Sequence, residues 1–279
     1  MADRGPEQDV ARHYGRVDVA AAILDGLRAA GKNLDALTPD DLAPFDQLHS
    51  RGKAATLELI ELAGLRGGER VLDVGGGLGG SARLLAAEPG CQVVVLDLTE
   101  AFCRAGERLT ELTGLSDRVT FRHGSALDLP FDDASFDVVW TQHSSMNITD
   151  KERLYAEIRR VLRPGGTLAL HEIMAGPVQP VLYPVAWAED PSISFLRPPE
   201  EIRALLGNLG FAERAWVDAT ADTIPWAQQR AVSFANARSG TTPPGLPALL
   251  GPVAVQIAQN QARNLAEQRV VVIEAVLTR

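Results

Sequence analysis

Residues 71–80, VLDVGGGLGG, place the acidic residue Asp73 just before a run of glycines at the end of an apolar segment. Glycine has no side chain, so the backbone of such a loop can approach a ligand closely, and the first amides of a following helix can point toward it. A second acid, Asp97, ends the next apolar segment, QVVVLD at 92–97, where its oxygens can accept hydrogen bonds from ribose hydroxyls. This order of residue types predicts a nucleotide-binding loop.

Two nucleotide cofactors fit the glycines. The stretch GGGLGG at 75–80 satisfies G-x-G-x-x-G, the dinucleotide turn that lays a pyrophosphate on a helix N-terminus. With Asp73 before it, the same stretch satisfies D-x-G-x-G-x-G, the loop that holds S-adenosylmethionine. Asp97 suits the ribose of either cofactor. Asp73 favours S-adenosylmethionine, because the end of the first strand is a suitable place to contact the cationic methionine end. An NAD(P)-dependent oxidoreductase stays open as the alternative from a different class.

Composition and charge narrow the class of protein. The chain has 279 residues, of which 46% are hydrophobic and 23% charged, which is enough for one large globular domain with added segments. The net charge of −9, with basic residues scattered along the chain, argues against a nucleic-acid partner. Two cysteines suggest neither a disulfide framework nor a zinc site, and no apolar run reaches about 18 residues. We therefore expect a cytoplasmic protein without a membrane partner.

Apolar segments of strand length alternate with helix-period segments along the chain. We expect strands at 70–74, 92–97, 118–122, 136–141 and 167–172, a weaker strand at 214–218 and a last strand at 269–278. The second and fourth are too apolar for a solvated face, which is typical of a parallel sheet covered on both sides. The alternation predicts an α/β fold, a Rossmann-like doubly wound sheet of seven strands that binds its ligand at the carboxyl ends of the strands.

Two helix starts are readable from their capping residues. In LTPDDL at 37–42, Thr38 is expected to cap a helix whose first residue is Pro39. Thr149 and Glu152 form the capping-box pattern of a second helix, and RPGG at 163–166 stops that helix.

Helical segments lie at both ends of the alternation. We divide the chain into an N-terminal helical cap at 1–66, a Rossmann-like core at 67–220, a helical insertion around the breaker SGTTPPGLP at 221–267, and a final core strand at 268–279. Both helical regions flank the ligand-binding end of the sheet, so we expect them to cover the site and exclude water. Their apolar faces are also a candidate homodimer interface.

The segments that follow the glycine loop carry a family resemblance. GSALDLPFDDASFDVVW at 124–140, followed by RRVLRPGGTLAL at 159–170, resembles the class I S-adenosylmethionine-dependent methyltransferases. The likeness covers roughly residues 68–175 and the last strand, which it implies to be antiparallel.

The resemblance implies where the cofactor is held. Asp73 and the glycine loop would hold its amino-acid part, Asp97 the ribose and Leu98 the adenine. At the position of Ser125 the family usually has Asp or Asn to meet the adenine amine, so this chain departs from the pattern, although a hydroxyl can still accept that hydrogen bond. The implied cofactor site consists of Asp73, Gly75, Gly77, Gly79, Asp97, Leu98, Ser125, Ala126 and Gln142.

Two further segments, 141–166 and 176–206, look like the small-molecule branch that includes sarcosine and dimethylglycine N-methyltransferases. The resemblance implies methyl transfer from S-adenosylmethionine, with S-adenosylhomocysteine as the product, to nitrogen or oxygen of a small metabolite. Nitrogen is preferred at this point because N-methyltransferases belong to that branch. C-methylation of a quinone-like or natural-product ring stays open, as does a binding module that transfers no methyl group.

Histidines near the expected site are candidate bases. A hydroxyl or carbon acceptor usually needs a general base, and His143, just past the fourth strand, is the leading candidate. His49 is the second, with His13 and His171 behind it. Each of these has an alternative interpretation as a structural residue.

The expected acceptor pocket takes its residues from three segments. Aromatic side chains between prolines after the fifth strand can hold an ammonium by cation-π attraction or can simply close a hydrophobic lid. The candidate acceptor-binding residues are Arg51, Met146, Asn147, Tyr183 and Trp187.

Two other methyltransferase types lack support in the sequence. The Asn- or Asp-Pro-Pro-aromatic motif of adenine-amine enzymes is missing where TQHSSMN follows the fourth strand. A metal-dependent enzyme needs an acidic cluster at the strand ends, where only Asp150 lies near. We therefore expect no metal.

Overall fold

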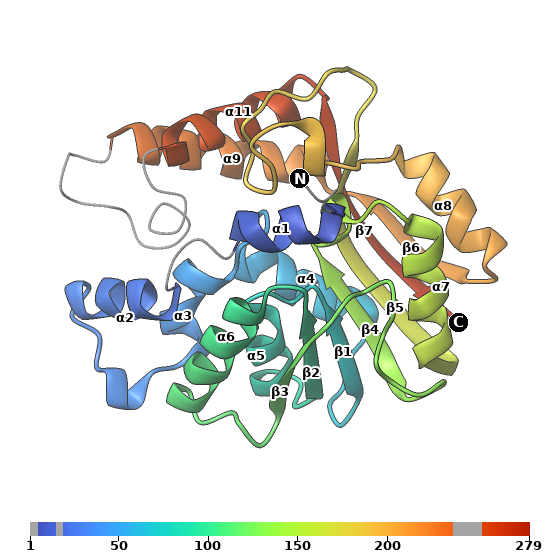
Figure 1. The fold of residues 1–279 in the computed structure, drawn as a ribbon, viewed down its shortest axis with the longest axis horizontal. Coiled ribbons are helices and arrows are strands. Elements are labelled where there is room, and N and C mark those ends of the chain that lie inside the picture. Colours follow the sequence, from blue (N-terminus) through green and yellow to red (C-terminus); the bar gives the residue numbers. More distant parts are fainter. Residues whose placement is uncertain (1–4, 15–18, 237–252) are drawn as a thin grey trace.

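A single seven-stranded sheet runs through the centre of the computed structural model, which describes residues 5–14, 19–236 and 253–279 (Figure 1). The strands are β1 (Arg70–Val74), β2 (Gln92–Asp97), β3 (Val119–His123), β4 (Phe136–Gln142), β5 (Leu162–Ala175), β6 (Ala212–Asp218) and β7 (Val270–Thr278). Their order in the sheet is β3-β2-β1-β4-β5-β7-β6, and β7 pairs antiparallel with both of its neighbours. The expected Rossmann-like α/β fold with a final antiparallel strand is confirmed.

The strand order reverses beside β1. The chain moves outward from β1 to β2 and β3, then returns to place β4 on the other side of β1. The loops after β1 and β4 therefore separate from each other, and a crevice opens at the carboxyl ends of these strands. Asp73 in β1, Asp97 at the end of β2 and Gln142 at the end of β4 all reach this edge.

Helices cover both faces of the sheet. On one face, α4 (Lys53–Ala63) and α5 (Gly80–Ala87) pack on Val71, Val93 and Trp140, and α6 (Glu100–Leu112) packs against β2 and β3. On the other face, α7 (Lys151–Val161) and α8 (Pro199–Asn208) bury their apolar stripes against Val139 and Leu168. Full burial of one such aliphatic side chain contributes about 1.5–3 kcal/mol. Covering on both faces explains why β2 and β4 read as nearly continuous apolar runs.

One predicted helix cap is confirmed and the other is wrong. Thr38 caps α3 (Pro39–Asp46) in a capping box with Asp41, and Pro39 is the first helical residue. At α7 the capping residue is Asp150 rather than Thr149, because the Asp150 carboxylate accepts the backbone N–H of Arg153 at 2.8 Å. The helix therefore starts one residue later than the Thr149 pattern predicts.

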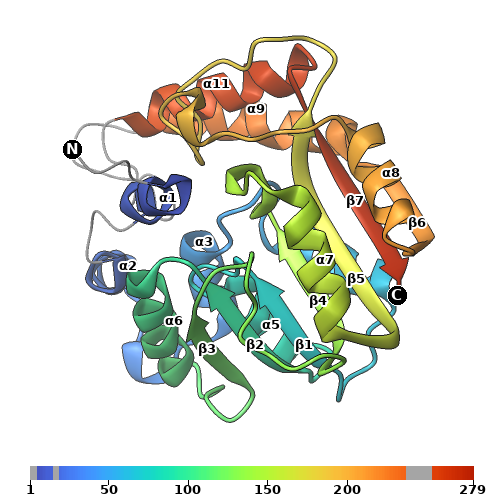
Figure 2. The same ribbon diagram turned by 45° about the vertical axis from the view of Figure 1, so that its right-hand side comes forward.

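The added helices lie on the ligand side of the sheet. Before β1 come α1 (Pro6–Tyr14), α2 (Val19–Ala29), the short η1 (Leu34–Ala36) and α3, and between β6 and β7 come α9 (Thr220–Asn236) and α11 (Ala254–Ala266). The short helices η2 (Ser145–Asn147) and η3 (Pro191–Ile193) follow β4 and β5. Figures 1 and 2 show α1 lying between the sheet edge and the pair α9 and α11. The breaker at 239–247 lies outside the described residues.

The division of the chain into a cap, a core and an insertion remains a prediction. Among the described residues, none of the helices combines the length and the apolar character that a membrane crossing requires.

Candidate active site

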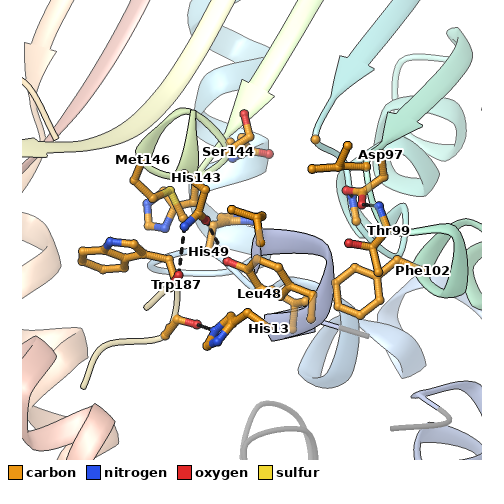
Figure 3. Close-up of a pocket in the computed structure, with 18 of the residues that line it drawn as sticks. His13, Leu48, His49, Asp97, Thr99, Phe102, His143, Ser144, Met146 and Trp187 are labelled. Carbon is orange, nitrogen blue, oxygen red and sulfur yellow. Dashed lines mark hydrogen bonds between the residues drawn. The ribbon is translucent and has the colours of Figure 1, made fainter. Parts of the chain in front are cut away.

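One cavity at the carboxyl ends of the strands joins the central sheet to the added helices. Its volume is about 290 Å³, and its walls come from the loops after β1, β2 and β4, from α1, and from α9 and α11. Figure 3 shows two groups of side chains in it, with Asp97, Thr99 and Phe102 on one side and His49, His143, Met146 and Trp187 on the other. We call these the cofactor half and the acceptor half.

The glycine loop of the cofactor half has the backbone that only glycine adopts easily. Gly75 and Gly77 have φ angles of 71° and 56°, in the left-handed region. A side chain at Gly75 would also place its Cβ 2.4 Å from Cβ of Ser144. The amide of Gly77 donates to Asp97 Oδ2 at 2.9 Å, and the amide of Thr99 donates to Asp97 Oδ1 at 2.8 Å. Asp97 therefore fixes the shape of the loop in addition to facing the cavity.

Three buried polar atoms in the walls of the cofactor half have no hydrogen-bond partner among the described residues. They are Oδ2 of Asp73, Oδ1 of Asp46 and Nε2 of Gln142. The orientation of Gln142 is fixed because its Oε1 already accepts from Ser81 Oγ at 2.6 Å and from Trp140 Nε1 at 2.9 Å. Two acceptor oxygens and one donor amide are thus left to complement a ligand with an ammonium and a carboxylate group.

The two acidic residues with these free oxygens are held in different ways. Asp46, the last residue of α3, forms an ion pair with Arg83 at 2.6 Å, and both side chains are buried. Asp73 has no such partner among the described residues, and burial, together with the charge of Asp97, raises the pKa of Asp73 to about 7. A cationic ligand group beside Asp73 would favour the ionised carboxylate.

A cluster of three histidines lies between the sheet and the acceptor half. The ring of His143 stacks on His171 with centroids 5.0 Å apart, and His49 lies 6.0 Å from His143 and 5.8 Å from His171. His171 Nδ1 is 2.9 Å from Glu274 Oε1 on β7, while Nε2 of His143 has no partner among the described residues. Within those residues, His, Cys, Asp and Glu side chains form no group of three with metal-binding geometry.

His143 and His49 are both neutral rings beside the cavity, and each has one ring nitrogen that can accept a proton. Burial and the neighbouring histidines lower the pKa of His143 well below its usual value, so the ring is neutral at neutral pH. Burial also lowers the pKa of His49, to about 3. Nε2 of His49 is 3.0 Å from the carbonyl oxygen of Gly52, which can only accept, so that nitrogen carries the proton. His143 also has a strained φ of 50° and a backbone N–H that donates to the His171 carbonyl at 2.9 Å.

Helix α1 closes the cavity by contacts to both halves. Glu7 accepts a hydrogen bond from Ser125 Oγ at 2.5 Å on the cofactor side. On the acceptor side, Tyr14 donates its hydroxyl to Asn147 Oδ1 at 3.0 Å. The Asn147 amide in turn donates to the carbonyl oxygens of Trp187 and Ile193 at 2.9 and 2.7 Å. The Asn147 side chain therefore connects α1 to the loop after β5, and these two segments form the lid of the cavity. Little of its hydrogen-bonding capacity is left for a substrate.

The structure brings most, but not all, of the predicted site residues to the cavity. The residues that line it are His49, Asp73, Gly75, Gly77, Asp97, Leu98, Ala126, Gln142, His143, Met146, Asn147 and Trp187. Those that lie outside its lining are Arg51, Gly79, Ser125 and Tyr183. Arg51 instead pairs with Glu58 at 2.5 Å and lies 3.9 Å from Glu274, so its charge is already balanced. Ser125 Oγ bonds to Glu7 and accepts the amide of Leu127, which occupies the hydroxyl expected to meet adenine.

Several lining residues were not predicted from the sequence. In the cofactor half they include Asp46, Ser81 and Phe102, and in the acceptor half Trp226, Arg230, Ile257 and Gln261. Asp46 belongs to a helix far from the glycine loop in sequence, and the others in the acceptor half lie on α9 and α11. A short motif cannot reveal such residues, because only the packing of the added helices brings them to the sheet.

Comparison with known proteins gives these observations a family context. Residues 72–170 match the family described as a methyltransferase domain. The chain is 34% identical over 156 residues to a sarcosine/dimethylglycine N-methyltransferase of Halorhodospira halochloris. That alignment covers 54% of this chain and 54% of that protein. The chain is also 34% identical over 161 residues to a 27-O-demethylrifamycin SV methyltransferase of Amycolatopsis mediterranei, which covers 57% of each.

A solved structure extends the likeness to the added helices. Geranyl diphosphate C-methyltransferase from Streptomyces coelicolor A3(2), in complex with Mg2+, geranyl diphosphate and S-adenosyl-L-homocysteine, aligns with a TM-score of 0.72. The alignment has 20% identity and covers 100% of this chain and 99% of that one, so it shows a shared fold alone. The chain spans about half the length, or less, of the first curated relatives it matches.

Proposed function

We propose that this chain, which belongs to the class I methyltransferase family through residues 72–170, transfers a methyl group from S-adenosylmethionine to a small-molecule acceptor. The observation that carries the proposal is the single cavity lined by Asp46, Asp73 and His143, each of which has a buried side-chain atom without a hydrogen-bond partner among the described residues. When bound, S-adenosylmethionine supplies an electrophilic methyl group on a sulfonium.

The residues of the cofactor half fit that cofactor group by group. Asp97 would accept the ribose hydroxyls, and Leu98 and Ala126 would flank the adenine. Asp73 would accept from the ammonium group, helped by Asp46, and Nε2 of Gln142 would donate to the carboxylate. The three buried atoms of Asp46, Asp73 and Gln142 would then each have a partner.

The same atoms argue against the dinucleotide alternative. A dinucleotide would bring its negatively charged pyrophosphate to the glycine loop, beside the buried acids Asp73 and Asp46. Like charges at a buried site repel strongly and raise the free energy of the complex. We therefore infer that the loop binds S-adenosylmethionine rather than NAD or NADP.

The acceptor half supports a hydroxyl acceptor. A hydroxyl is a weak nucleophile until it loses its proton, and a neutral histidine with a free ring nitrogen can take that proton as the new bond to carbon forms. His143 provides such a nitrogen, and its stacking on His171 and its backbone bond to the His171 carbonyl fix where the ring points. An amine acceptor needs only to arrive neutral, so it would not require His143 as a general base. The geometry thus favours oxygen over the nitrogen that sequence resemblance suggests.

An acceptor screen tests the proposal. Small amines, phenols and hydroxylated metabolites would be incubated with S-adenosylmethionine and the wild type, His143→Ala or His49→Ala, and S-adenosylhomocysteine would be measured. We expect a phenol or alcohol to be methylated, with about 100-fold slower turnover in His143→Ala and a smaller effect in His49→Ala. Turnover of glycine, sarcosine or dimethylglycine with all hydroxyl compounds inert would show that the acceptor atom is nitrogen. Acceptor binding without S-adenosylhomocysteine formation would identify a binding module.

A cytoplasmic location and a homodimer belong to the same proposal. Both cysteines, Cys91 and Cys103, are free and buried, which is compatible with a reducing compartment. Val232 on α9 and Val255 on α11 are exposed and offer apolar surface to a second copy. Light scattering on the purified protein would separate a monomer from a dimer.

A further inference from the structure

An arginine that has no ion-pair partner among the described residues lines the acceptor half. Arg230, on α9, is the one arginine among the described residues that line the cavity. Its guanidinium carbon lies 5.2 Å from the ring centroid of Trp226 and 4.8 Å from that of Phe234. Among residues 5–14, 19–236 and 253–279, no carboxylate or hydrogen-bond acceptor contacts its side chain.

Two other partly or fully buried arginines of this protein have acidic partners, whereas Arg159 has none among the described residues. Arg83 pairs with Asp46 at 2.6 Å, and Arg160 pairs with Glu157 at 2.8 Å. At Arg230, by contrast, burial lowers the pKa to about 10 and no acid opposes the shift. The segment 237–252 that follows α9 contains no Asp or Glu in its sequence. A partly buried cation with no partner costs free energy, which a bound anion would offset.

The geometry leaves the hydrogen-bonding edge of Arg230 free. Aromatic rings offer no oxygen acceptor to the five N–H donors of a planar guanidinium group. Those donors lie in the plane and match the two oxygens of a carboxylate or the oxygens of a phosphate group. Trp226 and Phe234 thus hold Arg230 in place without satisfying it.

We propose that Arg230 binds an anionic group of the methyl acceptor, a carboxylate or a phosphate, so that the acceptor is an acid with an apolar body. The apolar body would contact Trp226, Ile257 and Met146 of the same cavity. This inference rests on the proposed function, since it names the class of molecule that occupies the acceptor half. It places the specificity for charge on the helical insertion rather than on the sheet.

Nuclear magnetic resonance of the arginine side chains tests the binding directly. The Nε–H signal of Arg230, assigned by its loss in Arg230→Gln, would be followed while benzoate, phenyl phosphate or the neutral benzamide is added to the S-adenosylhomocysteine-loaded protein up to the solubility limit. We expect benzoate or phenyl phosphate to shift this signal and benzamide to leave it unchanged. The stronger of the two anions identifies the carboxylate or the phosphate as the natural group. A signal that stays fixed with both anions, or that moves equally with benzamide, overturns the inference.

Variants separate the charge from the fold. Arg230→Gln should weaken binding of the preferred anion about 10-fold or more, and Arg230→Lys should keep part of it as a point charge. Arg203→Gln is the matched control, since Arg203 also lies over a tryptophan ring, 5.4 Å from Trp216, but pairs with Glu213 outside the cavity. Unchanged anion affinity in Arg230→Gln, or an equal loss in Arg203→Gln, would rule out the assignment.

Calorimetry with S-adenosylhomocysteine on the same samples distinguishes a failure of the proposed function from a failure of the assignment of Arg230. If the wild type fails to bind S-adenosylhomocysteine, the proposed function fails, whereas the anion titration of the protein without it still decides the assignment of Arg230. If S-adenosylhomocysteine binds and neither anion affects Arg230, only the present inference fails.

Discussion

The two halves of the cavity are formed by different elements of the fold. The cofactor half is made mainly from strand ends and the loops that follow them, and its polar groups are buried and closely arranged. The acceptor half is made mainly from α1, α9, α11 and the loop after β5, and it combines apolar side chains with His143 and Arg230. Among the described residues, Asp46 of α3 and Glu7 of α1 cross this division, because each brings a carboxylate from the added helices to the cofactor half.

This difference separates the general reaction from the choice of substrate. The carboxyl ends of the central strands are rigid, because each strand is hydrogen-bonded to its neighbours. They can therefore hold one cofactor with several hydrogen bonds at once. Helices packed above that edge can change shape and composition without altering the sheet. We infer that the cofactor is specified by the sheet and the acceptor by the added helices.

The largest expected effect is on the cofactor half. Asp97→Ala would remove the two hydrogen bonds that we propose Asp97 accepts from the ribose, each worth about 1.5–3 kcal/mol, and would also release the amides of Gly77 and Thr99. We expect S-adenosylhomocysteine affinity to fall at least 100-fold. Calorimetry on the variant, with Asp97→Asn for comparison, measures the loss. Affinity equal to wild type in Asp97→Ala would place the ribose elsewhere.

The connection between the halves can be broken at the buried ion pair. Asp46→Ala would leave the Arg83 side chain, which is fully buried, without its counter-charge, and the free energy of unfolding should fall by about 3–5 kcal/mol. Urea denaturation gives this number. The double variant Asp46→Leu with Arg83→Met should recover much of the stability, since no isolated charge remains. A loss below about 1 kcal/mol in the single variant would mean that the pair does not stabilise α3 on α5.

The pKa of Asp73 predicts how binding depends on pH. Because that pKa is about 7 in the free protein, well above the usual value near 3.8, a proton occupies Asp73 below pH 7 and must leave when the ammonium binds. S-adenosylhomocysteine affinity should therefore rise with pH up to about 7, by up to tenfold per pH unit, and level off above it. Titrations in buffers of different ionisation enthalpy would show proton release on the acidic side.

Asp73→Asn provides the control for that pH dependence. It should bind more weakly at pH 8 and lose the pH dependence between about pH 6 and pH 8, since no carboxylate titrates at this position. A wild-type affinity that is already constant over that range would contradict the assignment of Asp73 to the ammonium.

The smallest expected effect comes from weakening the contact of α1, which closes the cavity. Tyr14→Phe removes the hydroxyl that donates to Asn147 and leaves the α1 contact weaker by about 0.5–1.5 kcal/mol. The KM of the acceptor should rise a few-fold while S-adenosylhomocysteine affinity stays the same. A loss confined to cofactor affinity would mean that α1 serves the cofactor half instead.

The sequence predicts the cofactor half better than the acceptor half for a physical reason. Asp73, the glycine loop and Asp97 are placed by strands next to them in the chain, so local patterns such as VLDVGGGLGG are enough to find them. The seven strands were predicted to within a few residues, except that β5 begins at Leu162 and ends at Ala175.

The acceptor half depends on contacts that no local pattern describes. Arg230 reaches the cavity only because α9 packs over the site, and Arg51, although adjacent to the histidine region, turns away to pair with Glu58 and Glu274. His171, a weaker candidate than His143 from the sequence, stacks on His143 behind the cavity wall and lies 2.9 Å from Glu274. Such long-range pairings become visible only with the tertiary structure.

The central claim is that one cavity holds S-adenosylmethionine through its ammonium and ribose groups. Its most direct test is a calorimetric titration of the wild-type protein with S-adenosylhomocysteine and, separately, with NADH and NADPH. We expect S-adenosylhomocysteine to bind one site per chain and both dinucleotides to give no heat of binding, because their pyrophosphate would face Asp73 and Asp46. Binding of NADH or NADPH with no binding of S-adenosylhomocysteine would contradict the account.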